Sequence, residues 1–78
     1  MPRYSFDVID SNGQVRDEEG LELSHTDAMA SIVTRILLDL ANDEMQDERA
    51  LAIEVSVRDD TDFTIYTGTL NLSCVWRD

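Results

Sequence analysis

Only one segment of this 78-residue chain has the periodicity of a helix, and strand-like segments flank it on both sides. Its apolar residues fall on one arc of a helical wheel, and polar residues lie opposite. The arc consists of Met29, Ile32, Val33, Ile36, Leu37 and Leu40. A lone helix must bury such a stripe against other elements, and here the flanking strands are the available partner. We expect it to begin at a Ser24/Asp27 capping box and to end near Met45.

The segment before the helix has the pattern of a β-hairpin. Tyr4, Phe6 and Val8 alternate with polar residues, which is typical of a half-buried strand. Asn12-Gly13 is a strong hairpin signal because both residues tolerate positive φ. We therefore expect residues 14–17 to return as a short second strand, with Val15 facing inward.

The segment after the helix contains the strongest strand signal. Residues 51–57 alternate apolar with polar, and the acidic turn 59–62 leads into a last extended stretch from Phe63 to Trp76. The inward phase of that stretch changes part-way, which a β-bulge at Gly68 would explain.

The order β-β-α-β-β predicts an α+β fold in a single domain, residues 1–78. The architecture is a four-stranded, mainly antiparallel sheet with one helix packed on one face. Numbering the strands along the chain, the spatial order 2-1-3-4 follows if the third strand lies beside the first. The order 2-1-4-3 is the alternative.

Two segments carry a resemblance to a known family. The opening Met1-Pro2-Arg3-Tyr4 with Phe6, together with Arg16-Asp17-Glu18-Glu19-Gly20 and Glu22-Leu23, resembles short alphaproteobacterial proteins, common in rhizobia, of Domain of Unknown Function 6894. The similarity covers nearly the whole chain, although Ser24-His25 stands where a Pro-Asp pair is more usual. The resemblance implies a fold. It implies no activity and no catalytic residues, because the family has none assigned.

Charge and composition exclude several function classes. Seventeen acidic residues against six arginines give a net charge of −11, which argues against contact with nucleic-acid phosphates or an anionic membrane surface. No apolar run is long enough to span a bilayer, and the polar start is not that of a signal peptide. One cysteine forms no internal disulfide and no zinc framework. We therefore expect a small cytoplasmic protein.

The candidate chemical sites all favour simpler interpretations. Asp10, Asn12, Gly13 and Glu19 match the later part of a calcium loop, but its first position would be Val8, which has no side-chain oxygen. His25 and Cys74 are the only candidates for a nucleophile–base pair, and we expect an exposed imidazole and a thiol buried in a strand.

The segment Arg16–Gly20 is interpreted as a solvated loop in which Arg16 pairs locally and Gly20 adopts positive φ. The predictions are thus no catalytic residue, no cofactor, no metal and no enzymatic activity.

Association with proteins is the function that remains. A second stripe, made of Ala30, Thr34, Leu38, Ala41 and Met45, borders the core arc. We also expect Ile9, Thr64 and Tyr66 on the sheet face that the helix leaves open. The sequence therefore predicts a homodimer that uses Leu38 and Met45, or Ile9 and Tyr66, besides an unidentified protein partner. The alternative is an acidic decoy that imitates nucleic acid towards a DNA-binding protein.

Overall fold

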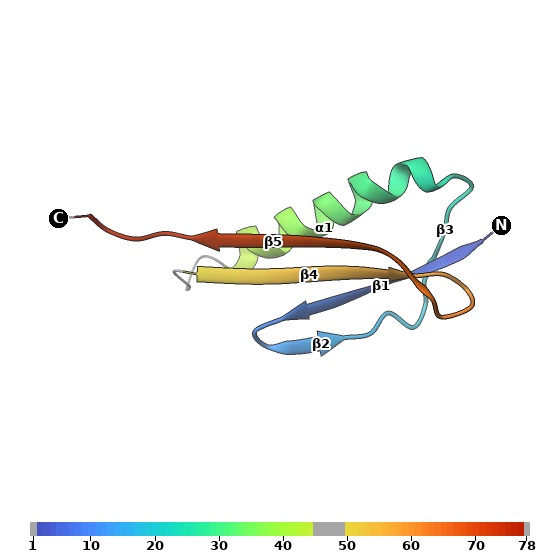
Figure 1. Cartoon of the computed structure of the whole chain (residues 1–78), viewed down its shortest axis with the longest axis horizontal. Coiled ribbons are helices and arrows are strands. Elements are labelled where there is room, and N and C mark those ends of the chain that lie inside the picture. The colour runs from blue at the N-terminus through green and yellow to red at the C-terminus, as the bar shows by residue number, and fades with distance from the viewer. Residues whose placement is uncertain (1, 45–49, 78) are drawn as a thin grey trace.

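The computed structural model describes residues 2–44 and 50–77 and has one helix beside one sheet (Figure 1). Its elements in chain order are β1 (Arg3–Asp10), β2 (Gly13–Val15), β3 (Leu21–Glu22), the 3-10 turn η1 (Thr26–Ala28), α1 (Met29–Glu44), β4 (Ala50–Arg58) and β5 (Thr64–Ser73). The predicted α+β class is confirmed. The two-residue strand β3 was not predicted from the sequence.

The sheet has the spatial order β2-β1-β4-β5, and every pairing in it is antiparallel. With β4 and β5 counted as the third and fourth strands, this is the predicted order 2-1-3-4. β3 pairs with the beginning of β1, on the same side as β2. The pairing of β1 with β4 stops at Ile9 and Glu54, whereas β4 and β5 remain paired to Ala50 and Ser73. β4 and β5 therefore extend as a two-stranded arm beyond β1, and the molecule is elongated, measuring 54 × 23 × 17 Å.

The core lies between α1 and one face of the sheet. Alternate residues of β4 are buried, as its periodicity predicted, and they meet the helix stripe. The buried apolar residues are Phe6, Met29, Val33, Leu37, Ala41, Leu51, Ile53, Val55 and Val57. Ile32, Ile36 and Leu40 are partly buried against them. At about 25 cal/mol per Å² of apolar surface buried, this layer is the main source of stability.

The β1–β2 hairpin forms where Asn-Gly predicted it, with a different loop. Asp10 pairs with Gly13, so the loop residues are Ser11 and Asn12, and only Gly13 has positive φ, at 124°. β2 covers Gly13–Val15 rather than residues 14–17. Val15 is opposite Val8 but remains 69% exposed, so the prediction that it faces inward into the core was wrong. Because α1 covers β4 and β5, it does not reach the β2 edge.

The two ends of the helix differ from the sequence prediction in different ways. The Ser24/Asp27 capping box is absent, because the helix enters through a 3-10 turn whose N-cap is His25 and which has no side-chain cap. Asp27 still lies in the first turn. α1 is described to Glu44, and the predicted end at Met45 lies outside the described residues. Ala41, assigned from the sequence to the second stripe, is buried in the core instead.

The irregularity in β5 lies at Ile65 and not at Gly68. Thr64 pairs with Arg58 and Tyr66 with Val57, which leaves Ile65 as the extra residue. Gly68 pairs regularly with Val55, and its backbone runs directly under the helix. A Cβ placed there would lie 2.5 Å from Val33 Cγ1. The glycine is therefore required by the close approach of α1 to β5, and the bulge prediction at this position was wrong.

Substitution of Gly68 tests this close approach. We expect Gly68→Ala to lower the free energy of unfolding by about 1–3 kcal/mol, because the added methyl group overpacks the contact with Val33. Urea unfolding followed by circular dichroism measures the change. In the Val33→Ala background the same glycine substitution should cost clearly less, since the clashing methyl groups are gone. Equal costs in both backgrounds would contradict the contact.

Candidate association surface

The most buried polar group of the described chain is an ion pair on the open face of the sheet. Arg58 Nε donates to Asp7 Oδ2 at 2.6 Å, and Arg58 Nη2 donates to Asp7 Oδ1 at 3.1 Å. The side chain of Asp7 is only 6% exposed and that of Arg58 12%. The hydrogen bonds from Arg58 hold the pKa of the Asp7 carboxyl below its ordinary value, against the opposing effect of burial. Asp7 and Arg58 therefore form a bidentate, charge-assisted pair.

Asp17 connects this pair to the edge of β1. The pairing of β1 with β2 and with β3 leaves a gap around Phe6, whose N–H donates to Asp17 Oδ2 at 3.0 Å. The Asp17 N–H donates in turn to Asp7 Oδ1 at 2.9 Å, and its carbonyl oxygen accepts from Arg58. The Asp17 carboxylate thus takes the place that a neighbouring strand would occupy.

The pKa of Asp17 is lowered although burial alone would raise it. The N–H groups of Phe6, Gly20 and Glu19 all donate to its carboxylate and outweigh the cost of burial. The sequence interpretation of this loop was partly wrong. Gly20 has positive φ as expected, but Asp17 is partly buried. Arg16 pairs with Asp62, which is distant in sequence, rather than locally.

These groups give no indication of catalysis. Asp7 and Asp17 are held ionised by saturated hydrogen bonding, so neither is a proton donor at neutral pH. Within residues 2–44 and 50–77, no buried side-chain nitrogen or oxygen lacks a hydrogen-bond partner. In the same ranges no three His, Cys, Asp or Glu side chains are grouped to hold a metal ion. The cluster of Asp7, Asp17 and Arg58 therefore has a structural role, and we call it the ionic lock.

The remaining sequence candidates are separated in space. The turn η1 that follows His25 and the end of β5 that precedes Cys74 lie at opposite ends of the molecule (Figure 1). Cys74 is exposed beyond β5, so the predicted burial of its thiol in a strand was wrong. In the calcium-like segment, β1 stands where a calcium-binding helix-loop-helix would require a helix.

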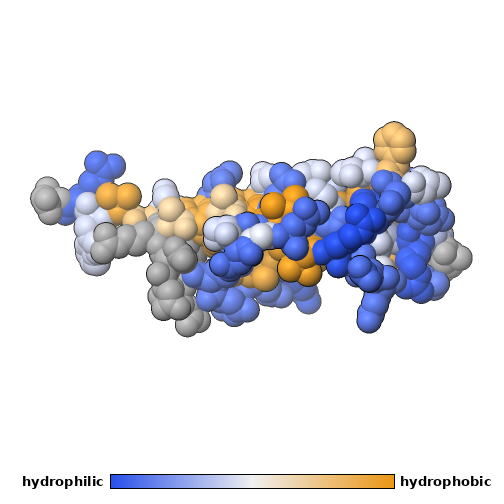
Figure 2. All heavy atoms as spheres, turned by 90° about the horizontal axis from the view of Figure 1, so that it is seen from below, coloured by the Kyte–Doolittle hydropathy of each residue, from blue (hydrophilic) through white to orange (hydrophobic). Residues whose placement is uncertain are grey.

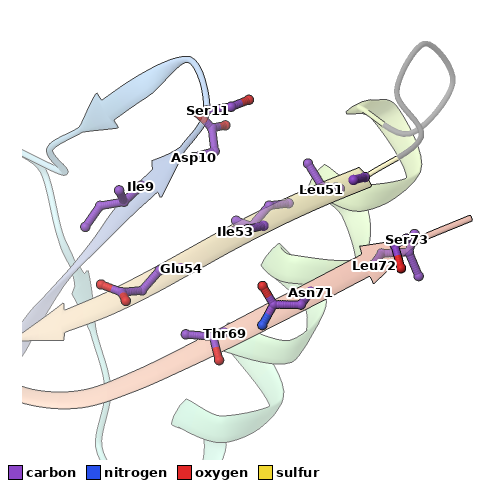
Figure 3. A pocket seen from close by; sticks show the side chains of 12 residues that line it. Ile9, Asp10, Ser11, Leu51, Ile53, Glu54, Thr69, Asn71, Leu72 and Ser73 are labelled. Atoms are coloured by element: carbon purple, nitrogen blue, oxygen red, sulfur yellow. The ribbon is translucent and has the colours of Figure 1, made fainter.

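A shallow hollow of about 790 Å³ lies on the open face (Figure 3). It arises because β1 turns into the hairpin at Asp10 and Ser11 while β4 continues without it. Thr69 and Asn71 of β5 form its far side. Its ionisable lining residues are Asp10 and Glu54. Hydroxyl groups of Ser11, Thr69 and Ser73 also line it, but no His, Lys or Arg that could activate one of them does. Such a lining does not favour an active site.

The predicted self-association residues divide between the two faces of the sheet. Leu38 is 56% exposed, Tyr66 38% and Ile9 36%. Ile9 pairs with Glu54 on the open face, whereas Tyr66 pairs with the buried Val57 and therefore lies on the helix side. The placement of Tyr66 on the open face was wrong, because the extra residue Ile65 shifts the phase. Met45 lies outside the described residues.

The outer edge strand of the sheet, β5, contains Tyr66, and Leu38 lies on the helix flank beside it. Within the described ranges β5 pairs only with β4, so one side of this ten-residue strand has free backbone groups. Val33 and Leu37 lie over Gly68, and the next positions round the helix are Ala30, Thr34 and Leu38. That flank of α1 therefore lies on the side of the outer edge of β5, beyond which part of the helix extends in Figure 1. We call the outer edge of β5 with Ala30, Thr34 and Leu38 the β5 surface.

The β5 surface lacks two of the features that commonly protect a sheet edge, charged side chains and proline. Exposed edge strands usually contain charged side chains or proline, or are short. β5 contains neither, although 29% of the chain is charged. Apolar atoms also remain visible elsewhere, in a band between polar ones on the side shown in Figure 2. Scattered exposure of that kind is ordinary, so the uncharged edge is the more specific signal.

Comparison with known proteins assigns a family. Residues 3–71 match the family described as Domain of unknown function (DUF6894). The chain belongs to this family. The resemblance inferred from its opening segments is thus confirmed, and the match extends from β1 into β5. No curated protein and no solved structure matches the chain. No helix of the described residues is long and apolar enough to cross a membrane.

Sequence reasoning missed both the ionic lock and the edge. Asp7, Asp17 and Arg58 are far apart in the chain, and nothing in their spacing predicts that they meet. The edge had a readable signal: residues 64–73 contain no charged residue in a chain with a net charge of −11.

Removal of the Asp7 carboxylate tests the ionic lock. We expect Asp7→Asn to lower the free energy of unfolding at pH 7 by about 2–3 kcal/mol, because the largely buried Arg58 then retains only the exposed Asp62 as a charged partner. Glu22→Gln breaks the exposed pair with Arg3 and should cost less than about 1 kcal/mol. Denaturant titration of the three proteins measures both differences.

The pH dependence of this effect has a definite sign. The pKa of Asp7 in the folded protein lies below its ordinary value of 3.8. Its contribution is therefore complete well above pH 3.8 and is lost as the pH falls through the folded-state pKa. The stability difference between wild type and Asp7→Asn should be constant from pH 7 to about 5 and narrow below about pH 3.5. A difference that widens on acidification would contradict the ionised pair.

Proposed function

We propose that this chain is a non-enzymatic protein–protein association module, located in the cytoplasm, that forms a homodimer through its β5 surface. The observation that carries the proposal is the uncharged edge of β5, with Leu38 exposed beside it. Backbone pairing along such an edge supplies affinity, and alternate side chains supply selectivity. An unidentified protein partner would use the same module in its dimeric form.

The small size of the chain supports self-association. A 78-residue sheet with one helix buries little apolar surface per residue, so the margin over conformational entropy is narrow. Pairing a second sheet edge adds buried area without lengthening the chain. Two-fold symmetry is the usual outcome when identical chains associate.

The alternative, an acidic decoy of nucleic acid, has weaker support. A mimic needs exposed carboxylates in rows at phosphate-like spacing. Asp7 is instead turned inward and paired with Arg58, and the Asp17 carboxylate accepts from backbone N–H groups. Asp62 contacts both Arg58 and Arg16. The other acids concentrate in loops such as 59–62.

Light scattering behind a sizing column tests the proposal. We expect a mass near 17.8 kDa, twice the 8.9 kDa of one chain, at tens of micromolar. Leu38→Asp should return the mass to that of one chain, because it places a charge in the β5 surface. Val15→Asp is the matched control, since Val15 is similarly exposed but lies on the opposite edge strand β2.

Two results would contradict the proposal. The first is a wild-type mass of 8.9 kDa at this concentration. The second is a dimer that Leu38→Asp leaves intact and Ile9→Asp dissociates, since this would place the contact on the open face of the sheet.

A further inference from the structure

We propose that the occupant of the β5 surface is a second copy whose β5 pairs antiparallel with this one, about a two-fold axis that passes through the sheet beside Thr69. This inference rests on the proposed function and specifies its geometry. The order of strands across the dimer becomes β2-β1-β4-β5 followed by the same strands of the partner in reverse. The result is one continuous sheet with both helices on the same face.

The symmetry follows from the two faces of the strand. A two-fold axis perpendicular to a sheet reverses the strand direction and keeps each face on its own side. The helix-facing residues of β5 then meet the helix-facing residues of the partner, and the polar open faces also become continuous. A parallel pairing would instead set the apolar side of one copy against the polar side of the other.

The register follows from the irregularity at Ile65. Beyond it the strand is regular, with Tyr66, Gly68, Leu70 and Leu72 on the helix side. A centre at Thr69 sets Tyr66 opposite the partner's Leu72 and Gly68 opposite the partner's Leu70. These pairings match an aromatic ring with an aliphatic side chain and place a bulky residue beside each glycine. A centre at Gly68 would set two glycines together and carry Leu72 past the irregularity to Thr64.

The same axis brings the two helices together. α1 lies over β4 and β5 on the side of this edge, so the partner's α1 would run antiparallel beside it. The residues that face the partner are Ala30, Thr34 and Leu38, two small side chains and one large. Small residues permit the roughly 8–10 Å separation of packed helices, and Leu38 fills the space between them. The exposure of Leu38 in the single chain is thereby explained.

Charge also favours a second copy. The segment 74–77 continues the line of β5 (Figure 1), so in an antiparallel pair it runs past the beginning of the partner's β5. Arg77, for which the described residues offer no ion pair, then lies at the end of the partner's sheet that carries the acidic turn 59–62. Val75 and Trp76 approach the partner's Phe63, and Trp76 is 89% exposed in the single chain. No like charges meet along β5 itself, which lets two chains of charge −11 pair at this edge.

The area that a stable dimer needs is a small share of the surface of this chain. A standard interface buries about 800 Å² on each partner. That is roughly one seventh of the 5835 Å² surface of this chain. β5 spans about 34 Å at about 3.4 Å per residue, and the helix flank adds a second strip beside it.

Disulfide trapping tests the register. In a Cys74→Ser background we introduce Thr69→Cys or, as the matched control, Thr67→Cys. Both positions lie on the open side of the same strand and are exposed. Across the axis the two sulfurs introduced by Thr69→Cys would be within disulfide range, since directly paired Cα atoms lie about 4.5–5.5 Å apart. Two residues at position 67 would be displaced by four residues, about 14 Å.

Mild oxidation followed by non-reducing electrophoresis should therefore link Thr69→Cys into a covalent dimer at least about tenfold faster than Thr67→Cys. Equal rates, or no linkage, in a chain that light scattering shows to be dimeric would overturn this geometry and leave the proposed function standing. A monomeric wild type would overturn both.

Trp76 and Arg77 provide a second measurement. Because Trp76 is the sole tryptophan, its emission should shift to shorter wavelength as dilute protein is concentrated, and Leu38→Asp should abolish the shift. Arg77→Glu should raise the dimer dissociation constant about two- to tenfold, and Arg77→Lys should restore it. An emission maximum independent of concentration across the monomer–dimer transition would contradict the antiparallel pairing.

Discussion

The packing of one helix against one face of a longer sheet is the contact on which the rest of this structure depends. Gly68 lets α1 approach β5 so closely that Val33 and Leu37 lie directly over the strand. This position covers β4 and β5 and leaves the β2 edge outside the core. It also sets the flank of the helix that carries Leu38 at the outer edge of the sheet. The core and the association surface thus have one origin.

The open face requires a different means of stabilisation because no helix covers it. Here the Asp7–Arg58 pair and the Asp17 carboxylate replace apolar burial with a saturated polar network. Such a network contributes little compared with an apolar core, but removal of one partner is costly. It also anchors the loop 16–20 to β1 and β4. An acidic chain is well suited to this arrangement, since a single arginine pairs with two carboxylates, those of Asp7 and Asp62.

The elements with regular periodicity were predictable, and those that depend on long-range contacts were not. The helix stripe and the alternation in β4 show in the sequence which residues are buried, so the fold class and the strand order could be predicted from them. Which residues of β5 face the helix could not be predicted, because the position of the irregularity depends on the pairing of Thr64 with Arg58 after the acidic turn. The same limit explains the ionic lock, whose members meet only after the sheet forms. The prediction of the helix start was wrong for a local reason. His25 occupies the N-cap, and a 3-10 turn replaces the capping box.

The charge of the chain and its uncharged edge have a joint consequence. A net charge of −11 opposes contact between two copies over most of their surface. This repulsion therefore disfavours contacts that place the acidic loops of two copies against each other. β5 is the one long strand of the described chain from which charged residues are missing, since β1 and β4 both contain acids and arginines. Repulsion elsewhere and backbone pairing at this edge favour the same orientation, so an acidic surface confers specificity on a strand that has no charge of its own.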